Sequence, residues 1–223
     1  MKKSILSLAL LFTLILAVNL QAQIKIGVVG GLNFSSVDIE TDGITQSSNT
    51  NFGIGGIIEL PVYKMFTIQL EPCYLRKGTD FKEEGNPLDF VFETNYFELP
   101  VLVKVNFGID YPYLFAGPTV GYLLTSELRT ELDGIQFTGD LKDVTEQFDY
   151  GISFGTGFEK SLGFGNLFFE ARYTLGLYNC QKGGSFEMKG GPVSETLEWE
   201  KDRDEYKNNG LQVMAGVKIP LKF

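Results

Sequence analysis

The chain has 223 residues, enough for one domain of ordinary size, and a formal net charge of -9. An acidic balance of this size disfavours nucleic acid as a partner. The sequence contains no histidine, so it lacks the commonest general base and metal ligand and cannot form a Ser–His or Cys–His nucleophile pair. Its many glycine and phenylalanine residues, 26 and 19, suit short strands and tight turns better than a helical core.

The first 22 residues have the pattern of a secretory signal peptide. Met1-Lys2-Lys3 is basic, an apolar stretch runs from Ser4 to Val18, and the small residue Ala22 precedes the expected cleavage site. The stretch is too short for a stable membrane span, although an uncleaved anchor is the alternative. No cysteine directly follows the expected cut, so a lipid-anchored amino terminus is not expected. We therefore assign residues 1–22 to a signal peptide and residues 23–223 to one barrel domain.

Eight later segments alternate apolar and polar residues with the period of two that is typical of β-strands. No apolar run after the signal peptide is long enough for a transmembrane helix. The expected strands, in chain order, cover about residues 24–36, 51–60, 66–77, 94–107, 112–124, 149–160, 166–178 and 209–223.

The connections between these strands alternate in length. Those after the second, fourth and sixth strands have about four or five residues, and the others have roughly 14 to 30. Short periplasmic turns and long outer loops are typical of outer-membrane barrels. In the third long loop, Asp133-Gly134 predicts a hairpin that projects above the membrane. The fourth contains the only tryptophan, Trp199, which we expect to pack on the barrel rim; an exposed side chain that contacts a partner is the alternative.

The last expected strand shows the clearest alternation and ends in the aromatic residue Phe223. This pattern predicts a lipid-facing strand, with Phe223 as the signal that the barrel assembly machinery recognises during insertion. Deleting Phe223 is therefore expected to reduce membrane insertion. The predicted fold is all-β, an eight-stranded antiparallel up-and-down transmembrane β-barrel in contact with lipids of the cell outer membrane. A soluble β-sandwich or a lipocalin-like barrel is the alternative, because alternation does not distinguish the inside from the outside.

The face opposite the apolar one carries charged residues of both signs. A barrel of eight strands has room inside for side chains and little else, so these residues are expected to pair in a packed lumen. The predicted lumen network comprises Lys25, Glu59, Glu71, Glu98, Lys104, Glu159, Glu170, Arg172 and Lys218. Four apolar residues, Val29, Ile57, Leu75 and Leu102, fall on the same face. Paired carboxylates such as Glu59 and Glu71 could act as acid and base, but Ser35, Ser126 and Ser153 lack a recognisable catalytic setting, so we expect no enzyme and no cofactor.

Aromatic residues near the strand ends are expected to form girdles at the two membrane surfaces. The predicted girdle on the short-turn side contains Phe66, Phe107, Tyr113 and Phe168. The predicted girdle on the loop side contains Phe34, Phe52, Tyr74, Tyr96, Tyr122 and Tyr178.

Two further features have residues that are typical of a metal site or a disulfide. Asp38, Glu40 and Asp42 match the opening of a calcium loop, but Asn49 stands where a bidentate glutamate is needed, so we expect a solvated acidic loop and no metal. Cys73 and Cys180 fall on opposite walls of the expected barrel, beyond the reach of a disulfide, so two free thiols are expected.

Three segments resemble the PorT-like outer-membrane β-barrel proteins of Bacteroidota. They are YFELPVLVKVNF (residues 96–107), PYLFAGPTVGYLL (residues 112–124) and FDYGISFGTGFE (residues 148–159). The segments carry the family's E-x-P, P-Y-x-x-x-G-P and D-x-G-x-x-x-G-x-G-x-E motifs in the family's order. The name-giving member is needed for type IX protein secretion, so the resemblance implies an accessory role in secretion or envelope assembly as the alternative function. The first expectation is a structural or binding role, with a possible protein partner at the acidic extracellular loops.

Overall fold

The computed structural model describes residues 23–38, 44–83, 89–108, 111–132, 134–199 and 206–221. These residues form one antiparallel sheet of twelve strands and a single 3-10 helix, η1 (Lys142–Val144). The strands are β1 (Lys25–Asp38), β2 (Ile44–Tyr63), β3 (Phe66–Leu70), β4 (Cys73–Glu83), β5 (Asp89–Asn106), β6 (Pro112–Leu132), β7 (Ile135–Asp140), β8 (Phe148–Ser161), β9 (Asn166–Gly176), β10 (Gly184–Gly190), β11 (Val193–Trp199) and β12 (Lys207–Pro220). None of the helical residues described here forms a segment long and apolar enough to cross a bilayer.

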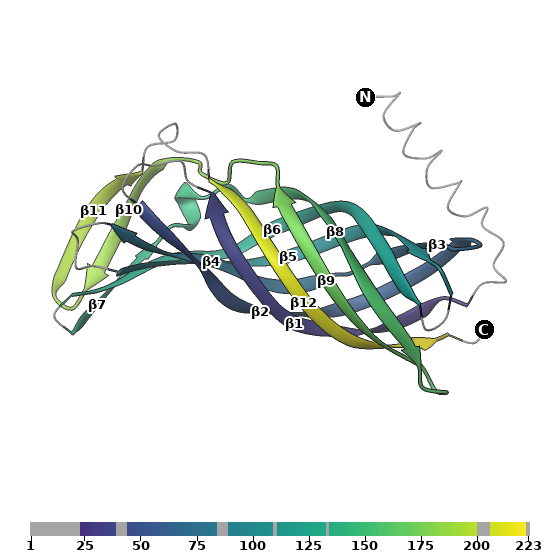
Figure 1. Cartoon of the computed structure of the whole chain (residues 1–223). Helices are drawn as coiled ribbons and strands as arrows, with labels where there is room; N and C mark the ends of the chain where they lie inside the picture. The colour runs from purple at the N-terminus through teal and green to yellow at the C-terminus, as the bar shows by residue number, and fades with distance from the viewer. Residues whose placement is uncertain are drawn as a thin grey trace, which may run out of the picture.

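The sheet closes on itself as a barrel (Figure 1). Strand β1 pairs with β2 on one side and with β12 on the other, and the ring continues through β9, β8, β6 and β5. The ring is completed by β3 and β4, which both pair with β2 and with β5 and so occupy one position in the wall. The described strands therefore give eight wall positions, and the predicted antiparallel up-and-down barrel is confirmed.

A proline causes the interruption between β3 and β4. Pro72 has no N–H to donate to the ladder, and proline is tolerated in sheets mainly at edges and irregularities. At this point the chain makes one backbone hydrogen bond with each neighbouring strand. Gly56 N–H of β2 donates to the Pro72 carbonyl at 2.9 Å, and Glu71 N–H donates to the Pro100 carbonyl of β5 at 3.2 Å. Alternation of the side chains continues across the break, so Glu71 remains buried inside the barrel.

The outer wall is apolar, as the period of two predicts. Val28, Ile54, Phe97, Val103 and Val213 lie in mid-strand and are each exposed on the outside of the barrel. This exposed apolar belt is the surface that a bilayer covers. The ends of β2, β5 and β8 that precede the short connections lie together at one end, which is the periplasmic end of such barrels (Figure 1).

The girdle prediction is wrong for three of its members. Tyr96, Tyr113 and Phe168 are buried inside the barrel rather than exposed at a membrane surface. Their neighbours explain the difference, because Tyr96 shares the inward parity of Glu98, and Tyr113 and Phe168 lie beside glycines that leave space for a ring. Phe66, Phe107 and Tyr178 are exposed at or just beyond strand ends. Phe52 and Tyr122 are exposed but lie in mid-strand, because β2 and β6 run further than expected. Phe34 and Tyr74 are half-buried.

At its long-loop end the sheet extends beyond the closed barrel. The predicted hairpin at Asp133-Gly134 is confirmed, because β6 and β7 pair from Leu132 and Ile135 onward. A second hairpin, β10–β11, was not predicted, and it joins β7 through Met188 and Lys189. We call β7, η1, β10 and β11 the extracellular platform (Figure 1).

Candidate functional site: a closed lumen and an extracellular platform

The end of the lumen nearest the short connections holds three lysines around two glutamates. Glu59 Oε1 lies 2.7 Å from the Nζ atoms of both Lys104 and Lys218. Glu159 Oε2 lies 2.7 Å from Lys218 Nζ and 3.1 Å from Lys104 Nζ, and its Oε1 lies 2.6 Å from Lys25 Nζ. Each charge therefore has at least one opposite charge within hydrogen-bond distance, which offsets the cost of removing it from water.

The middle of the lumen is built around Arg172. Its guanidinium lies 2.6 Å from Glu71 Oε2 and 2.9 Å from Glu170 Oε2. Gln69 donates to both carboxylates, and the Tyr113 hydroxyl donates to Glu170 at 2.8 Å. Side chains from β3, β6 and β9 and from the segment between β3 and β4 therefore share one network of ion pairs and hydrogen bonds, which ties distant parts of the wall together.

The end of the lumen nearest the platform contains two charged residues that were not among the predicted lumen set, Lys77 and Asp149. Lys77 Nζ lies 2.5 Å from Glu98 Oε1 and 2.9 Å from Asp149 Oδ2. Asn208 donates to the same Asp149 oxygen at 2.9 Å. Both residues share the inward parity of predicted neighbours, but each lies at the end of an expected strand, where the direction of a side chain is hardest to infer.

The structure places all nine predicted lumen residues on the inner face and joins each to at least one opposite charge. With Lys77 and Asp149, the three groups contain five cationic and six acidic side chains, so the lumen is almost neutral. Val29, Ile57, Leu75 and Leu102 are also buried inside, as expected. Charged pairs and apolar side chains together fill the bore.

The inward glycines give the lumen its shape. A Cβ added at Gly157 would lie 2.4 Å from the Tyr113 ring, and one at Gly155 would lie 2.7 Å from the Phe115 ring. Lys104 Nζ in turn lies 3.6 Å from the centre of the Tyr113 ring, a favourable cation–π distance. The alternating glycines of β8 therefore make room for rings that contact the buried cations.

Replacing Gly157 by leucine is accordingly expected to displace Tyr113 and break its hydrogen bond to Glu170. The overpacked side chain should destabilise the barrel by about 1–3 kcal/mol. Urea unfolding in detergent micelles would measure the loss. A glycine of a turn, such as Gly163, is unsuitable as a control, because its positive φ would strain any other residue. A suitable control is Ala171→Leu, which enlarges an exposed, outward-facing residue of the neighbouring strand β9 and should cost much less; equal losses would contradict the packing argument.

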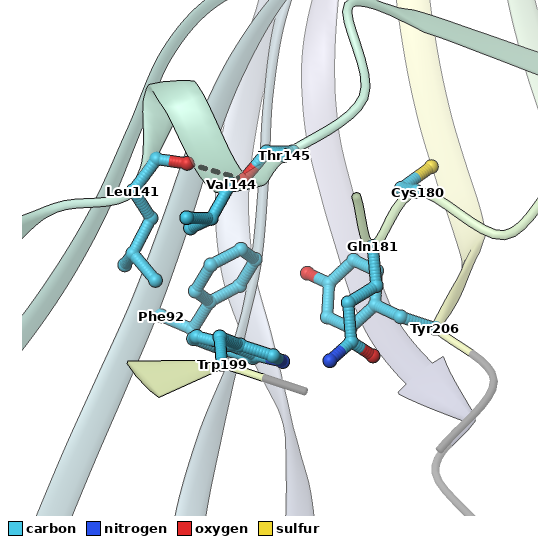
Figure 2. A pocket seen from close by; sticks show the side chains of 8 residues that line it. All are labelled: Phe92, Leu141, Val144, Thr145, Cys180, Gln181, Trp199 and Tyr206. Atoms are coloured by element: carbon cyan, nitrogen blue, oxygen red, sulfur yellow. Dashed lines mark hydrogen bonds between the residues drawn. The ribbon is translucent and has the colours of Figure 1, made fainter. Parts of the chain in front are cut away.

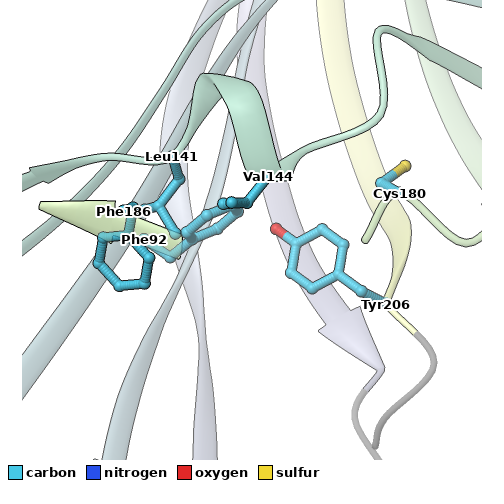
Figure 3. Packing of buried hydrophobic residues seen from close by; sticks show 6 residues of the cluster. All are labelled: Phe92, Leu141, Val144, Cys180, Phe186 and Tyr206. Atoms are coloured by element: carbon cyan, nitrogen blue, oxygen red, sulfur yellow. The ribbon is translucent and has the colours of Figure 1, made fainter. Parts of the chain in front are cut away.

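An apolar cluster lies where the platform meets the outer end of the barrel (Figure 3). Its buried members are Phe92, Leu141, Val144, Cys180, Phe186 and Tyr206. Trp199 packs against it, with ring centroids 6.3 Å from Phe92 and 5.9 Å from Phe186, so the expected packing of this tryptophan is confirmed. The cluster fastens the platform to the top of the barrel.

The cavity inside this cluster is small (Figure 2). Its free volume is about 10 Å³, room for about one water molecule and far below the range of about 300–1,000 Å³ that is usual for small-molecule sites. Burial raises the pKa of the neighbouring Cys180 thiol, with Asp149 contributing in the same direction, so this cysteine is poorly suited to act as a thiolate nucleophile. We interpret the cavity as packing space rather than a ligand site.

The remaining predicted features have mixed outcomes. Cys73 and Cys180 are both free and buried, as expected. Asn49 lies in β2, which begins earlier than predicted, and its amide donates to Asp80 Oδ1 on the paired strand β4 at 3.0 Å. Glu40 and Asp42 of the calcium-like segment lie outside the described residues, as do the signal peptide and Phe223. Within the part of the chain that the structure describes, no group of three or more acidic or cysteine side chains is arranged to hold a metal ion.

A family model for the outer membrane protein beta-barrel domain matches residues 19–182, well over half of the chain. The chain belongs to this family. The match and the closed barrel together place the protein in the outer membrane. A comparison with curated proteins gave no match.

Solved structures with a similar fold are small outer-membrane barrels. Ail, the attachment invasion locus protein of Yersinia pestis, solved with a heparin analogue, is 12% identical, with 89% of this chain and 100% of that chain covered and a TM-score of 0.45. OprG from Pseudomonas aeruginosa is 14% identical, with 91% and 97% covered and a TM-score of 0.44. The outer membrane protease OmpT from Escherichia coli is 10% identical, with 91% and 98% covered and a TM-score of 0.43. At these identities the likeness concerns the fold alone.

Proposed function

We propose that this protein is a closed barrel whose function is binding, with the extracellular platform as the binding surface. The observation that carries the proposal is the contrast between the two ends of the molecule. Paired charges fill the lumen, whereas the platform has its own apolar cluster and holds a two-stranded hairpin beyond the closed barrel. A rigid scaffold that presents an ordered outer surface is suited to recognition.

We further propose that the protein has no catalytic activity. The hydroxyls of three buried serines are engaged with groups that cannot act as bases. Ser35 donates to the Gly78 carbonyl at 2.8 Å, Ser126 pairs with Thr145 at 2.9 Å, and Ser153 lies between two threonine hydroxyls. The carboxylates of the lumen are paired with lysine or arginine and lie away from the outer surface.

The PorT-like assignment is also a proposal, and the structure gives its motifs a physical meaning. Glu98 of the E-x-P motif pairs with Lys77, and Tyr113 of the P-Y-x-x-x-G-P motif donates to Glu170. Asp149 and Glu159 begin and end the third motif, and both pair with lysines in the lumen. The motifs therefore support a shared way of packing a small barrel and leave the secretion role as an alternative.

The binding role can be tested by removing the β10–β11 hairpin. Replacing residues 184–199 by a short glycine–serine linker should leave a folded barrel that inserts into the membrane and migrates differently when unboiled. Protein partners captured from detergent extracts by the unmodified protein should then be lost. Partners that both forms retain would contradict binding at the platform and would favour the secretion alternative.

A further inference from the structure

The outermost strand of the platform has an open edge. Strand β11 pairs with β10 along its whole length, and among the described residues it is the only strand with a single neighbour (Figure 1). An unpaired edge presents a row of N–H and C=O groups that can pair with another chain. β11 can therefore accept one additional strand.

The geometry of the hairpin indicates which backbone groups are available. Gly190 and Val193 pair across the two-residue turn formed by Gly191 and Pro192, where Gly191 has a φ of 56°. Pairs that flank a two-residue turn are hydrogen-bonded, and hydrogen-bonded pairs alternate along an antiparallel ladder. Ser194, Thr196 and Glu198 are thus the residues whose N–H and C=O groups point toward the open edge.

The open edge is also negatively charged. Glu195 and Glu198 are exposed and point to opposite faces of β11, and neither has a cation beside it in the part of the chain that the structure describes. Glu187 on β10 differs, because it pairs with Lys189 at 2.8 Å. The edge therefore favours an incoming strand that carries positive charge.

The same charges argue against self-association through this edge. A second copy paired with β11 would bring four glutamates into one short strip, and like charges on neighbouring strands are destabilising. On its inner side, Leu197 and Trp199 pack against the apolar cluster, so β11 is already held in place. An edge that is held before binding loses less conformational entropy when a partner arrives.

We propose that β11 binds an extended segment of a partner protein by strand addition, and that this segment carries lysine or arginine opposite Glu195 and Glu198. The proposal rests on the binding role proposed above and specifies its surface and the chemistry of its ligand. Main-chain hydrogen bonds would supply affinity, and the two acidic side chains would select cationic strands over neutral or acidic ones.

The test uses the full mature protein in detergent micelles and a fluorescent nine-residue peptide. The peptide alternates threonine and valine and carries two lysines three residues apart; a second peptide has glutamates in place of the lysines. Fluorescence anisotropy should show that the lysine peptide binds and the glutamate peptide does not. Added salt should weaken the binding of the lysine peptide. Hydrogen exchange should show new protection of the amides of Ser194, Thr196 and Glu198.

Two pairs of variants separate edge pairing from simple attraction of charges. Thr196→Pro removes an N–H from the open edge without touching a bond to β10, and should weaken binding about tenfold, whereas Thr196→Val should not. Replacing Glu195 and Glu198 together by glutamine should weaken binding about fivefold and reduce its salt dependence. Glu187→Gln, on the neighbouring strand, should change little.

The outcomes distinguish this proposal from the broader one. Equal binding by Thr196→Pro and Thr196→Val, or no binding of the lysine peptide by the unmodified protein, would overturn strand addition at β11. If the hairpin deletion still abolished partner capture in that case, the binding role of the platform would stand without it. Dimers of the unmodified protein that Thr196→Pro dissociates would show that the edge accepts a second copy instead.

Discussion

Replacing Arg172 by alanine is expected to lower the free energy of unfolding by about 3–5 kcal/mol. The guanidinium lies 2.6 Å from Glu71 and 2.9 Å from Glu170, and its removal leaves two buried carboxylates without their shared cation. The side chain of Arg172 is only 1% exposed, so water cannot replace the lost partner. Urea unfolding of the micellar protein, followed by far-ultraviolet circular dichroism, would measure the change.

The matched control for this prediction is Arg129→Ala. Arg129 also contacts two glutamates, Glu127 at 2.5 Å and Glu93 at 3.9 Å, but its side chain is 38% exposed. Exposed ion pairs contribute about 0–1 kcal/mol, so this variant should unfold almost like the unmodified protein. Similar losses for Arg172→Ala and Arg129→Ala would show that burial of the lumen charges does not control stability.

Replacing Glu59 by alanine is expected to have an effect of the same size, about 3–5 kcal/mol. Glu59 accepts from Lys104 and Lys218 at 2.7 Å each, and both lysine side chains are fully buried. Without Glu59, three lysines would share Glu159 alone. The same urea titration would report the loss.

A second substitution tests whether uncompensated charge is the cause. Combining Glu59→Ala with Lys104→Met removes one charge of each sign and restores the original balance of this group. The double variant should therefore recover part of the stability that Glu59→Ala loses, since replacing both members of a buried pair costs less than removing one. A double variant less stable than Glu59→Ala alone would contradict this explanation.

The period-two pattern was sufficient to predict the barrel, its apolar outer face and its charged inner face. It was sufficient because each strand has one face toward lipid and one toward a narrow lumen, so parity alone assigns most side chains. Parity also placed Tyr96 and Tyr113 inside, but their aromatic character suggested a girdle. The deciding information was the space beside Gly121 and Gly157, which depends on the register between strands.

The platform was only partly predictable for a different reason. Asp133-Gly134 is a strong local turn signal, whereas the β10–β11 hairpin depends on Gly191-Pro192 and on packing of Phe186 and Trp199 against residues far along the chain. The break between β3 and β4 follows from Pro72, which has no N–H to donate, and its place in the wall is set by the hydrogen bonds from Glu71 N–H to the Pro100 carbonyl and from Gly56 N–H to the Pro72 carbonyl. Such contacts are tertiary, and a short sequence window contains no record of them.

The most direct test of the account is the electrical conductance of the purified, unmodified protein in planar lipid bilayers. The three charged groups and the inward rings fill the bore, and the apolar cluster lies at its outer end. We therefore expect no stable conductance steps, although the protein inserts and is heat-modifiable on a gel. Large, steady steps from the unmodified protein would contradict the closed lumen and would support transport of solutes through the barrel.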